Sequence, residues 1–327
     1  MKILICHHHR FELWCAPPWI RDRLALDFPE IQFTYLPDYE HMTPEIPDTD
    51  VLIGWSIKPE QLAAARKLRW IHSPAAAVHQ LMFPELINSD VIVTNSGAVH
   101  GPVVAEHAIT LLLALAKRLP QAAHYQQRKQ WAQETLWQEE PRPREVSGAT
   151  VLVIGMGSIG REFTVRARAL GMRVLAVRER PQKGLDGADA VYGVADLDAL
   201  LPQADYLLLC TPVTPATMHL INKGRLARMK PDAYLINVGR GPLVDESALI
   251  DSLTQRKIAG AGLDVFTEEP LPKDSPFWNL DNVLITPHTA AVTDRLWERH
   301  YHLIGENLRR FLAGQPLLNL IDKKSGY

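Results

Sequence analysis

The feature that most constrains the fold is an apolar strand segment that runs directly into a glycine-rich turn and then into a helix-forming segment. The strand segment is residues 150–154, and the turn after it contains Gly155, Gly157 and Gly160. In such a motif one glycine makes the tight turn, one lets the backbone approach a pyrophosphate, and one packs the helix on the strand. The N–H groups that begin the helix, at Ser158 and Ile159, then face phosphate charge. The motif therefore predicts a βαβ unit that binds a dinucleotide.

The end of the next strand segment, residues 173–177, is where such a unit distinguishes NAD from NADP. An acidic residue there binds the ribose 2′-hydroxyl of NAD, whereas an arginine accommodates the 2′-phosphate of NADP. Arg178 occupies this position, and Arg180 is placed to hold the phosphate from a second side. Glu179 lies between them and would serve a ribose if the register shifted by one residue. We therefore expect NADP(H) as the preferred cofactor, with NAD(H) as the alternative.

Segments of strand and helix character alternate along most of the chain. Strands are expected at residues 3–6, 31–35, 51–53, 70–72 and 91–94, with a helix at 61–68, and a second series follows at 150–154, 173–177, 206–210, 233–238, 260–264 and 283–286. Such alternation predicts parallel sheets with helices on their faces. A chain of 327 residues has room for two such domains. The predicted fold class is α/β with two doubly wound parallel sheets: a substrate domain from 1–100 and 293–327, and a nucleotide-binding domain from 101–292.

The segment that joins the two series is expected to begin with a long apolar helix at 103–119. This helix is apolar on nearly all sides, which is typical of complete burial. Its histidine, His107, is expected to be a packing residue. The polar stretch 120–147 is expected to be a connecting excursion in which Trp131 and Trp137 are buried anchors.

Composition argues against several classes of protein. The formal net charge of −2 comes without a basic block, so no nucleic-acid partner is expected. The longest apolar run, 108–116, is far shorter than the roughly 20 residues that span a bilayer, so no membrane partner is expected. Three scattered cysteines suggest neither a disulfide framework nor a metal site, and adjacent histidines at 7–9 would point to opposite faces of an extended chain. We therefore expect a cytoplasmic protein without a bound metal.

Ionisable residues follow three of the later strand segments. They are Arg240, Asp264, Glu269 and His288. Ligands of open parallel sheets bind beyond the carboxyl ends of the strands, so these residues are expected to line one site. Reduction of a 2-oxo acid needs a cation that holds the carboxylate, an acid that protonates the ketone oxygen, and a carboxylate that orients this acid. Arginine, histidine and glutamate supply these three groups.

With these motifs, the sequence resembles the D-isomer-specific 2-hydroxyacid dehydrogenase family over nearly the whole chain, from the loop at 73–79 to beyond His288. The resemblance implies a Rossmann domain inserted into a smaller, flavodoxin-like substrate domain. It also implies that Arg240 of the Arg-Gly segment binds substrate, that Glu269, directly before Pro270, supports the base, and that His288 of the Pro-His pair carries the proton.

The resemblance implies further contacts around the reaction centre. Asp264 would contact the nicotinamide amide, and Thr211 and Val238 would lie against the cofactor. Backbone N–H groups at Ala76 and Ala77, where the family usually has glycines, would receive the substrate carboxylate.

The implied activity is hydride transfer between NADP(H) or NAD(H) and a small 2-oxo or 2-hydroxy acid, of the glyoxylate or hydroxypyruvate type, in a homodimer. The alternative is a non-catalytic regulator that senses NAD(P)H on the same fold. The absence of a long interaction segment in the sequence weighs against that alternative.

Overall fold

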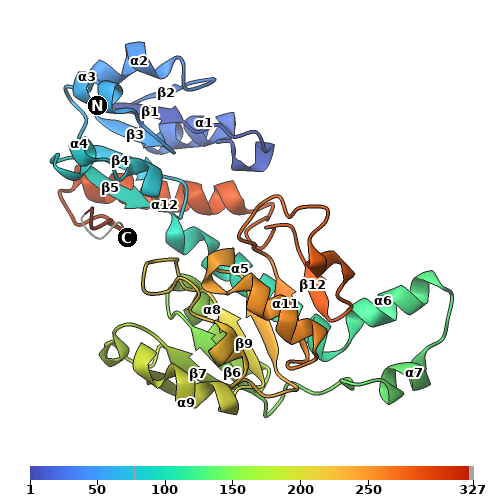
Figure 1. Ribbon diagram of the computed structural model, residues 1–327. Helices are drawn as coiled ribbons and strands as arrows, with labels where there is room; N and C mark the ends of the chain where they lie inside the picture. The colour runs from blue at the N-terminus through green and yellow to red at the C-terminus, as the bar shows by residue number, and fades with distance from the viewer. Residues whose placement is uncertain (77, 324–327) are drawn as a thin grey trace. The chain divides into compact units, whose positions relative to one another are not determined.

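The computed structural model describes residues 1–76 and 78–323, which form two compact units. Unit 1 consists of Met1–His100 and Val292–Tyr327, and unit 2 consists of Gly101–Ala291. The sequence analysis predicted that the nucleotide-binding domain ends at residue 292, one residue later than the end of unit 2. Each unit is an α/β domain built on one parallel sheet, which confirms the predicted fold class (Figure 1).

The sheet of unit 1 has five parallel strands in the order β2-β1-β3-β4-β5, which is the flavodoxin-like order. The strands are β1 Lys2–Cys6, β2 Gln32–Tyr35, β3 Val51–Gly54, β4 Trp70–Ser73 and β5 Ile92–Asn95. Every residue of β3 and β4 is buried, as expected for strands with helices on both faces. The helices are α1 Pro18–Asp27, α2 Met42–Glu45, α3 Pro59–Ala64, α4 Pro84–Ile87 and α12 Leu296–Leu312.

Helix α12 returns the end of the chain to the domain with which the chain begins. It packs on α1, and Figure 1 shows it in red beside the blue N-terminal elements. Trp297, Tyr301, Ile304 and Leu308 recur at helical spacing and are buried in the same cluster as Ile3. Unit 1 is therefore a discontinuous domain whose core depends on both ends of the chain.

The sheet of unit 2 has seven parallel strands in the order β12-β11-β10-β9-β6-β7-β8. The strands are β6 Thr150–Ile154, β7 Arg173–Val177, β8 Ala190–Tyr192, β9 Tyr206–Leu209, β10 Tyr234–Asn237, β11 Gly260–Leu263 and β12 Val283–Ile285. Chain order reverses between β6 and β9, which is the switch point of a Rossmann domain. The short edge strand β8 was not predicted from the sequence.

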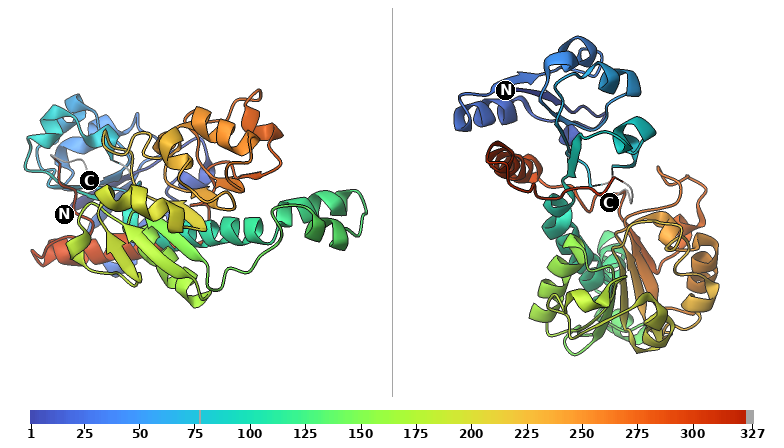
Figure 2. Two further views of the ribbon diagram at one scale, coloured as in Figure 1. Left: turned by 60° about the horizontal axis from the view of Figure 1, so that its bottom comes forward. Right: turned by 90° about the vertical axis from the view of Figure 1, so that its left-hand side faces the viewer.

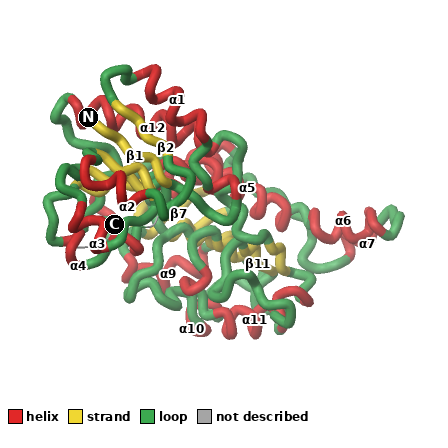
Figure 3. The backbone as a smooth tube through the Cα atoms, turned by 90° about the horizontal axis from the view of Figure 1, so that it is seen from above, coloured by secondary structure: helices red, strands yellow, loops and turns green. Residues whose placement is uncertain are grey.

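Alternate residues of the strands in unit 2 enter different cores on the two faces of the sheet. Leu152 of β6 belongs to one buried cluster, and its neighbours Val151 and Val153 belong to the other. The flanking helices are α5 Gly101–Ala116 and α8 Ser158–Ala169 on the second cluster, with α9 Leu197–Leu200, α10 Lys223–Leu226 and α11 Glu246–Thr254 on the first. The tube in Figure 3 shows helices around the yellow strands of this sheet.

Helix α5 ends earlier than predicted and is buried on one side only within the chain. It packs on α8, β10 and β11 through residues such as Ala108, Leu111 and Leu112. The side chains of Glu106 and Thr110 remain exposed on the opposite stripe, so the expectation of burial on all sides was wrong. The stretch Gly97–Ala116 is long and apolar enough to span a membrane by length and composition. Its packing on the sheet accounts for that apolar character.

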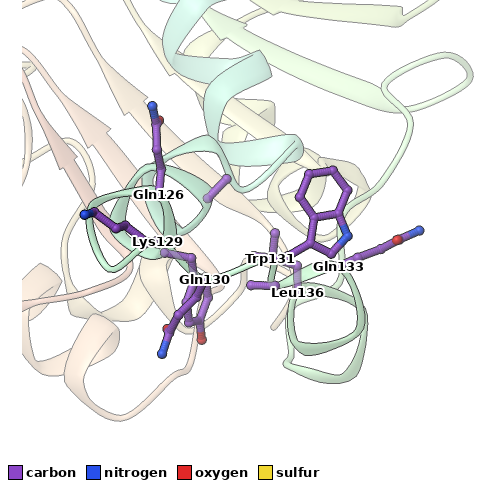
Figure 4. Close-up of a pocket in the computed structure, with 9 residues that line it drawn as sticks. Gln126, Lys129, Gln130, Trp131, Gln133 and Leu136 are labelled. Atoms are coloured by element: carbon purple, nitrogen blue, oxygen red, sulfur yellow. The ribbon is translucent and has the colours of Figure 1, made fainter.

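The excursion after α5 contains two helices, α6 Leu119–Gln127 and α7 Gln133–Gln138, that extend away from the sheet of unit 2 (Figure 2). The expectation that both of its tryptophans are buried was wrong, because Trp131 is 92% exposed and Trp137 is 59% exposed. Trp131 helps to line a hollow of about 510 Å³, together with residues of both helices such as Gln126 and Leu136 (Figure 4).

Candidate active site

The turn between β6 and α8 has the backbone geometry that a dinucleotide pyrophosphate requires. Gly155 adopts a φ of +103°, which side chains rarely allow. A Cβ on Gly160 would meet the carbonyl oxygen of Gly155 at 2.0 Å, so only glycine permits this approach of helix to strand. A Cβ on Gly157 would meet no described atom within 4 Å, which leaves its backbone open to a ligand. The turn therefore fits a bound dinucleotide.

Helix α8 begins at Ser158, directly after this turn, so the first-turn N–H groups at Ser158 and Ile159 point out of the helix toward the phosphate position. Thr211 lies on the other side of the turn, after β9, and its Cα would be 3.1 Å from a Cβ on Gly155. Val238, after β10, is buried and donates its N–H to the carbonyl of Leu209. These predicted cofactor residues thus follow neighbouring strands of one sheet.

Arg178 follows β7 as predicted, and its side chain already has a partner. Its Nη1 atom lies 2.5 Å from Oδ2 of Asp186, and both side chains are partly buried. The loop that returns Asp186 to this position has left-handed backbone at Gly184, Asp186 and Gly187. Arg180 is exposed. The structure therefore adds a carboxylate to the pair of arginines that the sequence singled out.

Arg240 projects from the loop after β10 and is exposed. Its Nη1 atom donates to the carbonyl of Gly239 at 2.6 Å, and in the described part of the chain no carboxylate forms an ion pair with it. A Cβ on Gly241 would meet backbone atoms of Phe266 and Thr267 at 2.0–2.4 Å, so this segment packs directly on the loop after β11. The guanidinium is therefore available to an anionic ligand beside that loop.

Glu269 and His288 form a hydrogen-bonded pair at the same edge of the sheet. Nδ1 of His288 lies 2.6 Å from Oε2 of Glu269, while Oε1 of Glu269 accepts the N–H of Phe266 at 2.9 Å. Phe266 thus links this pair to the Arg240 segment that packs on it. His288 remains half-exposed and has a φ of +53°. The structure therefore brings the three predicted catalytic residues to adjoining loops.

Asp264, directly after β11, is 1% exposed. Its Oδ1 accepts the hydroxyl of Thr286 at 2.6 Å and the N–H of Thr289 at 2.9 Å, and its Oδ2 accepts the N–H of Ala290 at 3.0 Å. Nε2 of His107 lies 2.9 Å from the Thr286 hydroxyl, so His107 is more than the packing residue expected from the sequence. Burial lowers the pKa of His107, against the opposing effect of the Asp264 charge.

The predicted substrate loop belongs to unit 1. The carbonyl of Ala76 accepts Nδ2 of Asn95 at 2.7 Å, and the carbonyl of Ala75 accepts the N–H of Ser96 at 3.1 Å. Ala77 lies outside the described residues. This loop is therefore anchored to the end of β5 through its carbonyl groups.

Sequence reasoning missed three residues near these sites. Asp186 was overlooked because a carboxylate in a glycine-rich loop gives no sign of the arginine that it meets. Thr286 and His107 were overlooked because their contact joins residues 179 positions apart in the sequence.

The comparisons with known proteins agree with this geometry. A family model described as the NAD-binding domain of D-isomer-specific 2-hydroxyacid dehydrogenases matches residues 109–290. A D-3-phosphoglycerate dehydrogenase of Methanocaldococcus jannaschii is 33% identical over 86% of this chain, which spans only 53% of that relative. A glyoxylate reductase of Korarchaeum cryptofilum is 34% identical over 85% of this chain and 84% of its own length.

A solved structure extends the match to the whole chain. The NADPH-dependent glyoxylate/hydroxypyruvate reductase of Sinorhizobium meliloti, in complex with NADP and sulfate, is 26% identical with a TM-score of 0.80. The superposition covers 100% of this chain and 99% of that one. With the glycine turn and the Arg240, Glu269 and His288 loops in place, the chain belongs to the D-isomer-specific 2-hydroxyacid dehydrogenase family, whose substrates are small 2-hydroxy and 2-oxo acids.

Proposed function

We propose that this protein is an NADPH-preferring reductase of small 2-oxo acids, of the glyoxylate or hydroxypyruvate type. The observation that carries the proposal is the hydrogen-bonded pair of His288 and Glu269 beside an arginine, Arg240, that no described carboxylate neutralises. The glyoxylate reductase and the glyoxylate/hydroxypyruvate reductase among its relatives support this substrate class.

In this proposal each of the three residues has a separate task. Because Nδ1 of His288 is engaged by Glu269, the proton that reaches the ketone oxygen is carried on Nε2. The Glu269 carboxylate accepts the Nδ1 proton and balances the positive charge of the protonated ring. Arg240 offers a planar fork to the carboxylate of the substrate and polarises its ketone.

When bound, the reduced nicotinamide supplies the hydride for carbon 2 of the oxo acid. The His288 proton joins the oxygen, so a 2-hydroxy acid leaves and a neutral imidazole remains. Oxidation of a hydroxy acid requires the neutral ring at the start, and the two directions therefore need opposite protonation states of His288.

NADPH is the proposed preference because Arg178 follows β7, where the ribose 2′ substituent of a dinucleotide lies. Arg180 is exposed nearby in the sequence and adds a second positive charge to that loop. The reductase of known structure that was solved with NADP supports this choice. NAD(H) remains the alternative cofactor of the proposal.

The proposed assembly is a homodimer formed through the α6–α7 excursion. Trp131 is 92% exposed on this excursion and, with Tyr125 and Leu136, helps to line the hollow. A large aromatic side chain and a hollow on the same surface are the components of a self-complementary interface, in which each copy fills the hollow of the other. The protein is further proposed to act in the cytoplasm without nucleic-acid, membrane or metal partners.

Absorbance at 340 nm tests the proposal directly. Purified protein is mixed with NADPH or NADH and with glyoxylate, hydroxypyruvate, pyruvate or a larger 2-oxo acid. We expect oxidation of NADPH with glyoxylate and hydroxypyruvate, and loss of that activity in Arg240→Ala. Tight NADPH binding without turnover on any of these acids would instead favour the non-catalytic regulator.

A further inference from the structure

The network around Asp264 has a fixed hydrogen-bond direction. Thr286 has one hydroxyl proton, and the 2.6 Å contact to the Asp264 carboxylate uses it, because an ionised carboxylate only accepts. The Thr286 oxygen must therefore accept the hydrogen bond from His107, whose Nε2 lies 2.9 Å away. His107 is thus the Nε2–H tautomer, and the relay runs from His107 through Thr286 to Asp264.

This relay secures the loop that carries the proton donor. Thr289 and Ala290, which follow His288, donate their N–H groups to the two oxygens of Asp264. Thr286, which precedes His288, donates its hydroxyl, so one carboxylate binds both sides of His288 in sequence. The carbonyl of Asp264 also accepts the N–H of His288 at 2.9 Å. The loop from 286 to 290 is therefore wrapped around a single buried residue.

The wrapping matters because His288 has an unfavourable backbone conformation. A φ of +53° in a non-glycine residue costs on the order of 1 kcal/mol, and it persists only when surrounding contacts hold it. The Glu269 hydrogen bond fixes the ring, but it does not fix the backbone on which the ring is mounted. The backbone is held by Asp264, and Asp264 is held by Thr286 and His107.

We propose that His107 and Thr286 are positioning residues, which act through Asp264 to hold His288 in the orientation required for proton transfer. His107 lies on α5 and Thr286 follows β12, so the relay connects the first helix of unit 2 with its last loop. Among the described donors, Oδ2 of Asp264 accepts a hydrogen bond from the N–H of Ala290 alone. This oxygen can therefore accept a further hydrogen bond from a group outside the loop. The kinetic consequences of this inference rest on the proposed function.

Pairs of variants distinguish the effect of losing a hydrogen bond from the effect of changing the volume of the side chain. Thr286→Val and His107→Leu keep the approximate volume and remove the hydrogen bond, whereas Thr286→Ser and His107→Gln retain a donor at the same reach. Thr110→Val is the matched control, because Thr110 lies on α5 and, among the described residues, its hydroxyl bonds to its own helix alone, at the carbonyl of Glu106.

With NADPH and glyoxylate, we expect Thr286→Val and His107→Leu to lower kcat by about 10- to 100-fold, since small displacements of a catalytic group have effects of this size. The KM for glyoxylate should change little, because Arg240 lies outside the relay. Thr286→Ser and His107→Gln should recover most of kcat, and Thr110→Val should match the wild type. Equal impairment of the donor-retaining and donor-lacking variants would reduce the two residues to packing and overturn the proposal.

Amide hydrogen exchange provides a test that does not depend on catalysis. In the full-length protein without substrate, the peptide that contains residues 286–290 should exchange roughly 2- to 10-fold faster in Thr286→Val and His107→Leu, as expected for the loss of one hydrogen bond. Unchanged exchange in both variants would overturn the relay even if the enzyme is active. Faster exchange in a protein that reduces no 2-oxo acid would support the relay while refuting the proposed function.

Discussion

The Nδ1 atom of His288 and the Oε2 atom of Glu269 lie 2.6 Å apart, and the other oxygen of Glu269 is fixed by the backbone N–H of Phe266. The carboxylate therefore has its orientation set by the main chain before it meets the ring. Because one ring nitrogen is committed in this way, the proposed mechanism places proton exchange with a ligand on the other.

Glu269→Gln keeps the size of this side chain and removes its charge. We expect kcat for the reduction of glyoxylate to fall by about 100-fold or more, because the protonated ring loses its counter-charge. The alkaline limb of the pH profile for reduction should move to lower pH. Glu268→Gln, at the exposed neighbouring position, is the control. A profile in Glu269→Gln that coincides with the wild type would remove the supporting role of Glu269.

Arg240→Lys keeps a positive charge and loses the planar fork. We expect the KM for the oxo acid to rise by about 10- to 100-fold, the loss that follows when a bidentate charged contact becomes a single one. The dissociation constant of NADPH, measured by fluorescence titration, should stay within about twofold. Arg225→Lys, which alters an ion pair with Asp198, serves as the control. An unchanged KM in Arg240→Lys would show that the carboxylate binds elsewhere.

Asp186→Asn tests whether the carboxylate beside Arg178 competes with a 2′-phosphate. The 2.5 Å ion pair must be broken or shared before Arg178 can bind the phosphate of NADPH. We expect the KM for NADPH to fall by about threefold to tenfold, with the KM for NADH unchanged. Arg178→Ala should change the KM for NADPH in the opposite direction. A higher KM for NADPH in Asp186→Asn would show that Asp186 positions Arg178 for the phosphate instead.

Unit 1 contains buried histidines that predict sensitivity to acid. His72 bonds to the hydroxyls of Thr94 and Ser96, and His300 shares Ser96. Burial lowers the pKa of His72 to about 3, lowers that of His7 to about 3, and lowers the pKa of His300 well below its usual value. The unfolded chain takes up these protons near pH 6.5, whereas the folded chain does not, so stability falls as pH decreases from about 6.5 toward 3.

The free energy of unfolding should therefore fall by about 1.4 kcal/mol per pH unit for each such histidine below pH 6, as measured by urea denaturation. His300→Asn should reduce that slope by the contribution of one proton. His302→Asn, an exposed residue on the same helix, should leave the slope unchanged. Equal slopes in the wild type and His300→Asn would contradict the assignment of acid sensitivity to His300.

Trp131→Glu tests the proposed homodimer. We expect the wild type to sediment as a dimer at micromolar concentration and this variant to sediment as a monomer, because a charge cannot fill an apolar hollow without a partner. Trp278→Glu changes another exposed tryptophan of unit 2 and should remain dimeric. A wild type that sediments as a monomer would exclude the interface at once.

The sequence predicted most of what periodicity and glycine chemistry control. Strand positions, the glycine-rich turn and the loops of Arg240, Glu269 and His288 could be predicted because buried strands are apolar runs and functional residues follow their carboxyl ends. The edge strand β8 was missed because its three residues are only partly buried and lack a clear pattern.

The errors arose where residue type is a poor guide to environment. Trp131 was expected to be buried because tryptophan usually is. A tryptophan that is exposed within one chain can instead belong to a surface that contacts another molecule. Helix α5 was expected to reach 119, but it ends at Ala116 and Arg118 adopts a left-handed φ of 54° two residues before Pro120. Contacts such as His107 with Thr286 depend on tertiary packing that periodicity does not encode.

The order of strands in unit 2 has a consequence for how enzymes of this kind can diversify. The loop proposed to face the ribose follows β7, whereas the residues proposed for acid–base chemistry and carboxylate binding follow β10, β11 and β12, with β6 and β9 between the two groups. Because the two sets of residues share no loop, changes in one can accumulate without disturbing the other. Coenzyme preference is thus a separable trait in this architecture, open to exchange by replacing the segment from Arg178 to Gly187 while the chemistry at His288 is inherited intact.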